Sequence, residues 1–300
     1  MKIKVLHNPY SNRWNSLKRW PEADSALKAA GVDFDLTISE YADQLVDLAA
    51  EAVKQGFTTI IAAGGDGTIG EVANGIARSW DGISKFPATI GILPLGSAND
   101  LAFSLGLPLD LNEAVKIIAA GKTRSIDLGK CNENYFVNNS AAGLEPYVTT
   151  KHERIRWIRG MVRYLVAAVW AIMDKPEWNG NLKWDGGDYN GPLSLLSIGN
   201  GRRTGGFFMT PHADPCDGKL TLAFGYRGTR LGLFGALPRA FKEGAGSYVE
   251  MEGMYEVHFT RLSVHLDRPS PAHTDGEIFD TWVTDLEYQI LPQAVPILSL

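Results

Sequence analysis

The sequence predicts two domains, an α/β domain with a mostly parallel sheet followed by a domain of antiparallel strands. As far as about residue 122, strand-like and helix-like segments alternate, which indicates right-handed βαβ units. Beyond that point, short strands separated by Gly, Pro, Asn and Asp follow one another with few helices between them, which favours an antiparallel sandwich or barrel. A chain of 300 residues is long enough for two cores of about 100 to 200 residues each.

The first domain is predicted from four strands and the helices between them. Pro21 stands near the start of the first helix and Gly31 at its end, and Gly56 ends the second helix. Asp110 and Glu113 match a capping box that opens the last helix. The predicted strands cover residues 2–8, 32–38, 58–63 and 88–93; the predicted helices cover 21–31, 41–55 and 111–121, with a further helix that ends at Arg78.

The second domain is predicted mainly from strands. Two helical stretches interrupt them, at 155–173 and near 231–241. The predicted strands cover 124–131, 134–140, 192–200, 218–226, 255–260, 261–267 and 285–291. We place the first domain at 1–122, together with the segment 290–300, and the second at 123–289.

Composition narrows the class of protein. The net charge of −5 argues against a nucleic-acid-binding protein, which usually presents an excess of positive charge. Cys131 and Cys216 are too few for a disulfide framework and lack metal-finger spacing, so we expect a reducing compartment, the cytoplasm. The N-terminus has no signal-peptide pattern, and the apolar stretch 164–173 is about half of the ~20 residues that span a bilayer. Any membrane contact should therefore be peripheral.

A glycine-rich loop follows the third predicted strand. Gly65, Gly67 and Gly70 have the G-x-G-x-x-G spacing, whose backbone N–H groups can hold phosphate at a helix N-terminus. A dinucleotide site would add an acidic residue ~20 positions later, yet "FPATIGILPLG" contains none. Asp66 inside the loop would repel phosphates unless a divalent cation lies between them. Phosphates with Mg²⁺ suit this loop, and a plain tight turn of an α/β fold is the alternative.

A second loop of the same kind follows the next strand. In "PLGSAND", residues 94–100, Asn99 and Asp100 stand where the next helix opens. Because the carboxyl ends of neighbouring parallel strands share one edge of a sheet, the two loops should face one crevice. Helix capping alone is the alternative role for these two residues.

Several motifs in one order resemble the diacylglycerol kinase catalytic family of lipid kinases, in particular its bacterial soluble members and the related sphingosine kinases. The motifs extend over most of the chain. They are "GGDGT" at 64–68, "PLGSAND" at 94–100, "IDLG" at 126–129, "FVNNSAAGLE" at 136–145, "PHADPCDGKLTL" at 211–222 and "TDGE" at 274–277. The resemblance implies a kinase in which an N-terminal α/β domain binds ATP and a C-terminal β-sandwich closes the cleft.

The resemblance also implies site residues. Asp275 matches the catalytic base, Glu277 an active-site acid near Mg²⁺, and Asp66 a third catalytic carboxylate. Asp66, Asp100 and Glu277, together with the phosphates, would provide oxygen ligands for Mg²⁺. From "ADPCDGK", the ligands of a structural metal are Asp214, Asp217 and the backbone oxygen of Lys219. The implied nucleotide-binding residues are Asn8, Thr37, Gly64, Gly65, Asp66, Gly67, Thr68, Glu71, Pro94, Gly96, Ser97, Asn99 and Asp100.

Some positions depart from the family or keep alternatives open. Phe103 stands where an arginine is frequent, which removes one charged contact near the nucleotide. Without the other motifs, Asp275-Gly276 would be a hairpin turn, and His273 is expected on the surface. The competing functions are an NAD-kinase-like or phosphofructokinase-like enzyme and a nucleotide-binding regulator without catalysis.

The expected partners are a lipid substrate and a membrane surface, with a homodimer left open and no nucleic acid. Diacylglycerol is the first candidate acceptor; sphingoid bases, phosphatidylglycerol and undecaprenol also offer a hydroxyl on an apolar body. A helix that carries His152, Arg156, Arg159 and Arg163 on one face could meet an anionic membrane, or cover the sandwich with solvated arginines.

Overall fold

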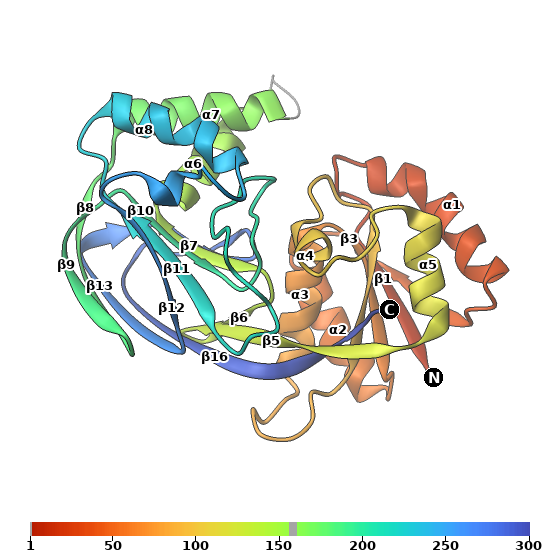
Figure 1. The fold of residues 1–300 in the computed structure, drawn as a ribbon. Coiled ribbons are helices and arrows are strands. Elements are labelled where there is room, and N and C mark those ends of the chain that lie inside the picture. The colour runs from red at the N-terminus through yellow and green to blue at the C-terminus, as the bar shows by residue number, and fades with distance from the viewer. Residues whose placement is uncertain (1, 156–160) are drawn as a thin grey trace.

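The computed structural model describes residues 2–155 and 161–300 and contains two domains joined by long strands (Figure 1). The N-terminal domain is α/β with a mostly parallel sheet, and the C-terminal domain is an antiparallel β-sandwich. The predicted fold class is therefore confirmed. The residue boundaries proposed for the domains stay a prediction.

The N-terminal domain has three layers. Its sheet has the order β2-β1-β3-β4, and helices cover both faces. Helices α1 (Asn15–Ala29) and α5 (Leu111–Ala120) pack on one face, and α2 (Gln44–Lys54) and α3 (Asp66–Ala77) pack on the other. The strands are β1 (Ile3–His7), β2 (Phe34–Ile38), β3 (Thr59–Gly64) and β4 (Thr89–Pro94). β1, β3 and β4 are buried, whereas β2 at the edge of the sheet is partly exposed.

Two strands connect the domains. The 16-residue β16 (Val283–Leu298) pairs with β13 (Arg261–Ser270) in the C-terminal domain, and near its end Ile297 lies beside Ile90 of β4. β5 (Thr123–Cys131) runs antiparallel to β16 along this path. Figure 1 shows both strands crossing from one domain to the other. One sheet thus continues through both domains and fixes the edge of the first beside the second.

The C-terminal domain is a sandwich of two sheets. One half is formed by β16, β13, β8 (Trp178–Trp184) and β9 (Gly187–Leu193), with β6 (Asn134–Phe136) paired to β5. The other sheet has the order β12-β11-β10-β7-β14-β15. Its strands are β7 (Asn139–Gly143), β10 (Leu195–Gly199), β11 (Leu220–Gly225), β12 (Met254–Phe259), β14 (Ala272–Thr274) and β15 (Glu277–Ile278). A shared apolar core, including Phe136, Phe259 and Leu286, holds the two sheets together.

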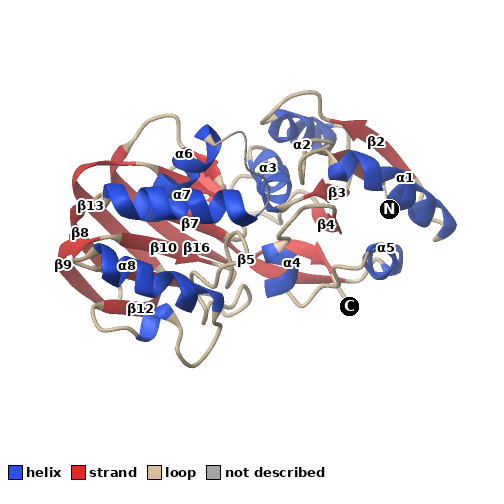
Figure 2. Cartoon of the chain, turned by 90° about the horizontal axis from the view of Figure 1, so that it is seen from above, coloured by secondary structure: helices blue, strands red, loops and turns tan. Residues whose placement is uncertain are grey.

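Helices cover the outer face of the second sheet, as Figure 2 shows. They are α6 (Leu144–Arg154), α7 (Met161–Asp174), α8 (Arg230–Ala236) and the 3₁₀ turns η1 (Leu237–Phe241) and η2 (Tyr248–Glu250). No helix among the described residues is long and apolar enough to cross a bilayer.

The structure differs from the predicted elements in several places, and one of them is helix α6, which was not predicted. Helix α1 begins at Asn15, so Pro21 lies inside it, although proline usually marks a helix start. The expected helix 155–173 corresponds to α7, which begins at Met161; residues 156–160 lie outside the described part of the chain. Strands β8 and β9 were not predicted, because Gly180, Gly187 and Gly191 weaken their strand pattern. The predicted capping box is confirmed, since the Asp110 side chain accepts from Glu113 N.

Candidate active site

The two glycine-bearing loops touch each other at the carboxyl edge of the parallel sheet. A Cβ placed on Gly96 would lie 2.3 Å from the Cα of Gly65, so only glycine at position 96 allows this approach. Asn99 adopts a left-handed conformation (φ 51°) and holds the second loop, because its Oδ1 accepts from Gly96 N at 3.1 Å. The predicted shared crevice therefore begins with two loops in direct backbone contact.

Asp66 joins the two loops through a helix N-terminus. Its Oδ1 accepts a hydrogen bond from Leu101 N at 3.0 Å, at the start of α4 (Asp100–Ser104). Asn99 occupies the N-cap position of α4 but its side chain does not cap it, so the carboxylate of the first loop supplies the missing acceptor. Burial raises the pKa of Asp66, and backbone N–H groups and Arg203 oppose that shift. A negative side chain in the glycine loop thus has a partner within the protein.

Glu71 plays the same part for α2. Asp43 at the N-cap of α2 is left-handed (φ 62°) and makes no capping bond, while Glu71 Oε2 accepts from Leu45 N at 3.1 Å. Burial, and then the nearby Glu277, raise the pKa of Glu71 to about 8. Helix α3 therefore carries two carboxylates, Asp66 and Glu71, that each complete the N-terminus of another helix.

Asp100 connects the two domains. Its Oδ2 accepts from Gly206 N at 3.1 Å, and its Oδ1 lies 3.2 Å from Arg203 Nε, both in the C-terminal domain. Burial and then Asp66 raise the pKa of Asp100 to about 6, and Arg203 opposes the shift. Neither Asp100 nor Asn99 therefore has the capping role that the sequence left open. Asp100 makes contacts across the interdomain cleft, and Asn99 makes contacts within its own loop.

The other expected nucleotide-binding residues surround these loops. Asn8 follows β1 and Thr37 lies near the end of the neighbouring β2. Thr68 Oγ1 lies 3.2 Å from Ser11 Oγ, which brings the loop after β1 against the glycine loop. Ser97 is exposed, and Arg19 donates to the carbonyl of Pro94, the last residue of β4. Their roles in nucleotide binding stay predictions.

The "TDGE" segment is a two-residue hairpin whose turn faces α3. Asp275 and Gly276 both have positive φ, 48° and 91°, as a tight hairpin between β14 and β15 requires. The Asp275 carboxylate accepts three backbone hydrogen bonds, from Val137 N at 2.8 Å and from Asn138 N and Asn139 N at 2.9 Å. Burial raises the pKa of Asp275 to about 6 despite these bonds. Its oxygens therefore organise the start of β7.

Glu277 is the accessible carboxylate of this hairpin. The residue is exposed, and a Cβ on Gly67 would lie 3.2 Å from its Oε1, so the carboxylate faces the glycine loop. Burial of the carboxyl group, and then Asp43 and Asp275, raise the pKa of Glu277. Ligand oxygens of Asp43, Glu71 and Glu277 lie within 4.8 Å of one another, and all three line a wide polar cleft between the domains.

The expected structural metal site lies beside β5. Asp127 is fully buried and accepts from Gly218 N and Gln293 N, each at 2.7 Å. Burial raises its pKa, and Asp217 and Asp214 add to the shift, so these carboxyl groups are close neighbours. Asp214 and Asp217 accept from the backbone two residues further on, at Cys216 and Lys219. The structural metal stays a prediction.

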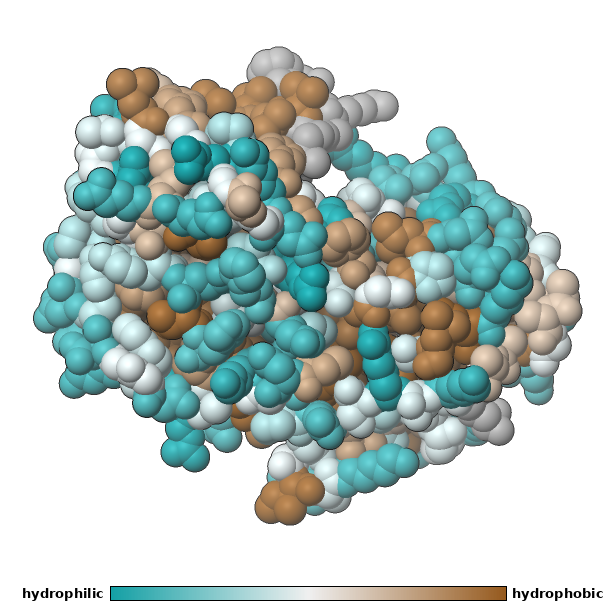
Figure 3. Space-filling model, viewed as in Figure 1, coloured by the Kyte–Doolittle hydropathy of each residue, from teal (hydrophilic) through white to brown (hydrophobic). Residues whose placement is uncertain are grey.

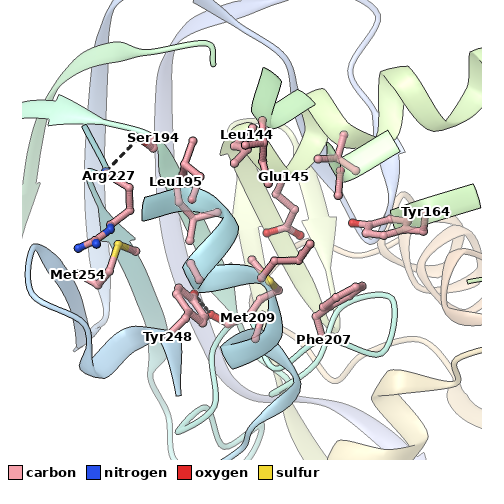
Figure 4. A pocket seen from close by; sticks show the side chains of 17 residues that line it. Leu144, Glu145, Tyr164, Ser194, Leu195, Phe207, Met209, Arg227, Tyr248 and Met254 are labelled. Atoms are coloured by element: carbon pink, nitrogen blue, oxygen red, sulfur yellow. Dashed lines mark hydrogen bonds between the residues drawn. The ribbon is translucent and has the colours of Figure 1, made fainter. Parts of the chain in front are cut away.

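An apolar pocket opens beside the hairpin, between the second sheet and its covering helices. It holds about 100 Å³ of free space and is lined by side chains such as Val148, Leu195, Met209 and Leu237 (Figure 4). Glu145 at the start of α6 points into it, as Figure 4 shows. This carboxylate lies 3.3 Å from His273 Nε2, and His273 Nδ1 accepts from Gly276 N at 3.2 Å. A buried chain of polar groups thus links the pocket to the "TDGE" turn.

Comparison with known proteins agrees with this arrangement. Residues 2–131 match the profile of the diacylglycerol kinase catalytic domain, and residues 138–299 match that of the YegS C-terminal NAD kinase beta sandwich-like domain. A protein of Mycobacterium tuberculosis named diacylglycerol kinase is 30% identical over 286 residues, covering 92% of this chain and 88% of its own. The chain belongs to the diacylglycerol kinase family.

Other members of the family extend the comparison. A probable lipid kinase YegS-like of Chromohalobacter salexigens is 32% identical over 203 residues, which span 67% of this chain and 64% of that protein. A crystal structure of a putative diacylglycerol kinase from Bacillus anthracis covers 100% of this chain and 97% of its own at 22% identity, with a TM-score of 0.78. The likeness to the Bacillus anthracis structure shows that the two proteins share a fold. The predicted family membership and kinase class are confirmed.

The sequence did not single out three of the residues that complete this site. Asp43 and Arg203 come from segments without a recognised role, and long-range contacts bring them to the cleft. Glu145 ends the motif "FVNNSAAGLE", but no role of its own was predicted for it. His273, expected on the surface, is buried at 2% exposure because β14 lies between β7 and β15. The adjacent Arg202 and Arg203, separated by one residue from a Gly-Gly pair, were the available signal for the arginine.

Proposed function

We propose that this chain is an ATP- and Mg²⁺-dependent kinase that transfers the γ-phosphoryl group to a lipid hydroxyl, with diacylglycerol as the first candidate acceptor. The observation that carries the proposal is the apolar pocket, connected through Glu145 and His273 to the turn that holds Asp275 and Glu277. Apolar walls that end at acidic groups suit an acyl chain with a hydroxyl head.

In this mechanism the nucleotide lies against the two touching glycine loops, and the N–H groups at the start of α3 hold its phosphates. The lipid hydroxyl oxygen forms the new bond to the γ-phosphorus while the bond from that phosphorus to the bridging oxygen breaks, and ADP leaves. Because the Asp275 oxygens already accept three N–H groups, Glu277 is better placed to accept the hydroxyl proton. Asp275 then acts as a positioning residue, in place of the base implied by the resemblance.

Mg²⁺ fits the carboxylates at the cleft better than those inside the loops. Asp43, Glu71 and Glu277 bring oxygens within 4.8 Å of one another, whereas Asp66 and Asp100 join no such group among the described residues; Glu71 keeps one bond, from Leu45 N. Hard oxygen ligands of this kind are those that Mg²⁺ prefers, with water and phosphate oxygens completing its shell. Asp43 and Glu71 would hold the ion, which would neutralise charge on the phosphates.

Membrane contact belongs to the same proposal. Large apolar side chains are exposed on the helices that cover the pocket, and Figure 3 shows this apolar surface on the C-terminal domain. They are Val162, Val169, Trp170, Met173, Leu231 and Phe241. Such a surface would let the enzyme take its substrate from a bilayer. In the basic helix considered from the sequence, Arg156 and Arg159 lie outside the described residues.

The test is transfer of radiolabelled phosphate from ATP to a panel of lipids in mixed micelles. We expect diacylglycerol to be labelled in the presence of Mg²⁺. Ala168→Trp places an indole in the pocket and should lower labelling of long-chain acceptors, while Ala29→Trp at the exposed end of α1 is the matched control. Labelling of NAD or a sugar instead would indicate another kinase, and no consumption of ATP would favour a regulator.

A further inference from the structure

The loop 200–210 of the C-terminal domain reaches across the cleft to the glycine loops. Thr204 and Phe207 pair as a β-bridge around Gly205 and Gly206, which both have positive φ, 60° and 87°. This tight turn directs Gly206 N to Asp100 Oδ2 at 3.1 Å. Asn138 Nδ2 donates to the carbonyl of Arg203 at 2.9 Å and fixes the start of the turn. The loop is therefore held in place from both domains.

Arg203 lies at the point where this loop meets the N-terminal domain. Its guanidinium carbon lies 4.3 Å from the ring centroid of Phe103 and 5.6 Å from that of Phe208, so the planar group packs against two aromatic rings. Its side chain is 19% exposed. Aromatic packing of this kind orients a guanidinium without using its N–H groups.

The N–H groups of Arg203 remain available. A guanidinium has five donors, and among the described residues none of them makes a hydrogen bond. Nε lies 3.2 Å from Asp100 Oδ1, yet neither atom has a partner in hydrogen-bonding geometry, although both are buried. A half-buried arginine with unused donors has the charge and the planar shape to bind two oxygens of a phosphate.

The surroundings of Arg203 are otherwise acidic. Asp66, Glu71, Asp100, Asp275 and Glu277 meet around the cleft. Arg203 lowers the pKa values of both Asp66 and Asp100. A polyphosphate that enters beside these carboxylates would therefore meet a positive protein group at Arg203.

We propose that Arg203 binds phosphate oxygens of the nucleotide in the interdomain cleft and positions the terminal phosphoryl group for transfer. The inference rests on the proposed function and assigns to the C-terminal domain a direct part in nucleotide binding. It also gives a reason for Phe103, whose ring supports the arginine supplied from the other domain.

The experiment measures binding of ATP, inorganic tripolyphosphate and adenosine by calorimetry, for the wild type, Arg203→Met, Arg203→Lys and Arg202→Met. Arg202 is the matched control because its guanidinium is already paired with Glu243 at 2.7 Å. Arg203→Met should weaken ATP and tripolyphosphate about ten- to hundredfold, the loss expected for charge-assisted hydrogen bonds, and leave adenosine unchanged. Arg203→Lys should keep part of the affinity that Arg203→Met loses. Arg202→Met should bind all three ligands as the wild type does.

The outcomes separate this inference from the proposed function. Equal ATP and tripolyphosphate binding in wild type and Arg203→Met would overturn the role of Arg203 and leave the kinase proposal standing. An equal loss for adenosine and ATP would also overturn it, because it would show a merely structural arginine. Binding of tripolyphosphate through Arg203 without any preference for ATP would support the anion contact and count against a nucleotide-dependent kinase.

Discussion

Gly70→Ala tests whether α3 and the "TDGE" turn must be in contact. Gly70 lies in the second turn of α3, and a Cβ there would lie 2.7 Å from Asp275 Cβ and 2.9 Å from its Oδ2. Ordinary contact begins at 3.4 Å, so the turn must move by about 0.7 Å. Overpacking of this kind costs roughly 1–3 kcal/mol, against a gain of up to about 1 kcal/mol in helix propensity.

The effect on catalysis should be larger than the effect on stability. A displacement approaching 1 Å at a reacting group costs about 10²-fold in rate, so kcat for lipid phosphorylation should fall by roughly that factor. Gly235→Ala in α8 is the matched control, because a Cβ there meets nothing within 4 Å. It should raise the melting temperature slightly and leave kcat unchanged. Wild-type kcat together with raised stability in Gly70→Ala would refute the reasoning.

Three further changes test other parts of the site. Glu277→Gln should lower kcat by about 10²- to 10⁴-fold without a change in melting temperature, and a variant that keeps its rate would remove Glu277 as the proton acceptor. Gly96→Ala should abolish ATP binding measured by calorimetry, since its Cβ would overlap the Cα of Gly65; retained affinity would show that the loops need not touch. His7 is buried against Trp20, and its pKa is lowered by burial to about 4 from 6.5. The unfolded chain therefore binds the proton more readily, and urea unfolding should show about 3 kcal/mol of stability lost as pH falls from about 6.5 to about 4. His7→Phe should remove this loss, and an unchanged pH profile in that variant would contradict the assignment.

Local patterns were sufficient to predict much of the fold. The alternation of strands and helices, the stops at Gly31 and Gly56 and the cap at Asp110 depend on neighbours in sequence, and the structure shows the corresponding elements. The start of α1 could not be predicted, because Asn12, Arg13 and Trp14 form a left-handed turn that is rare for residues other than glycine. Strands β8 and β9 also depend on packing against the sandwich core more than on their own propensity.

The sequence identified the acidic residues of the site better than it identified the groups that donate hydrogen bonds to them. Asp66 and Glu71 were recognisable as acids in a glycine-rich helix start, but the N–H groups that they accept from belong to α4 and α2. Likewise, Asp275 contacts backbone more than 130 positions earlier in the chain. Sequence periodicity carries no information on contacts at such separations, and the positioning role that we propose for Asp275 rests on these contacts.

The path of β16 has a consequence for biosynthesis. The ribosome makes this strand after all the other strands of the second domain, yet its end lies beside β4 of the first. The sheet of the nascent α/β domain therefore lacks the end of β16 while about 170 further residues are translated. Its exposed β4 edge is the place where a chaperone, or a neighbouring nascent chain, would be expected to attach during that interval.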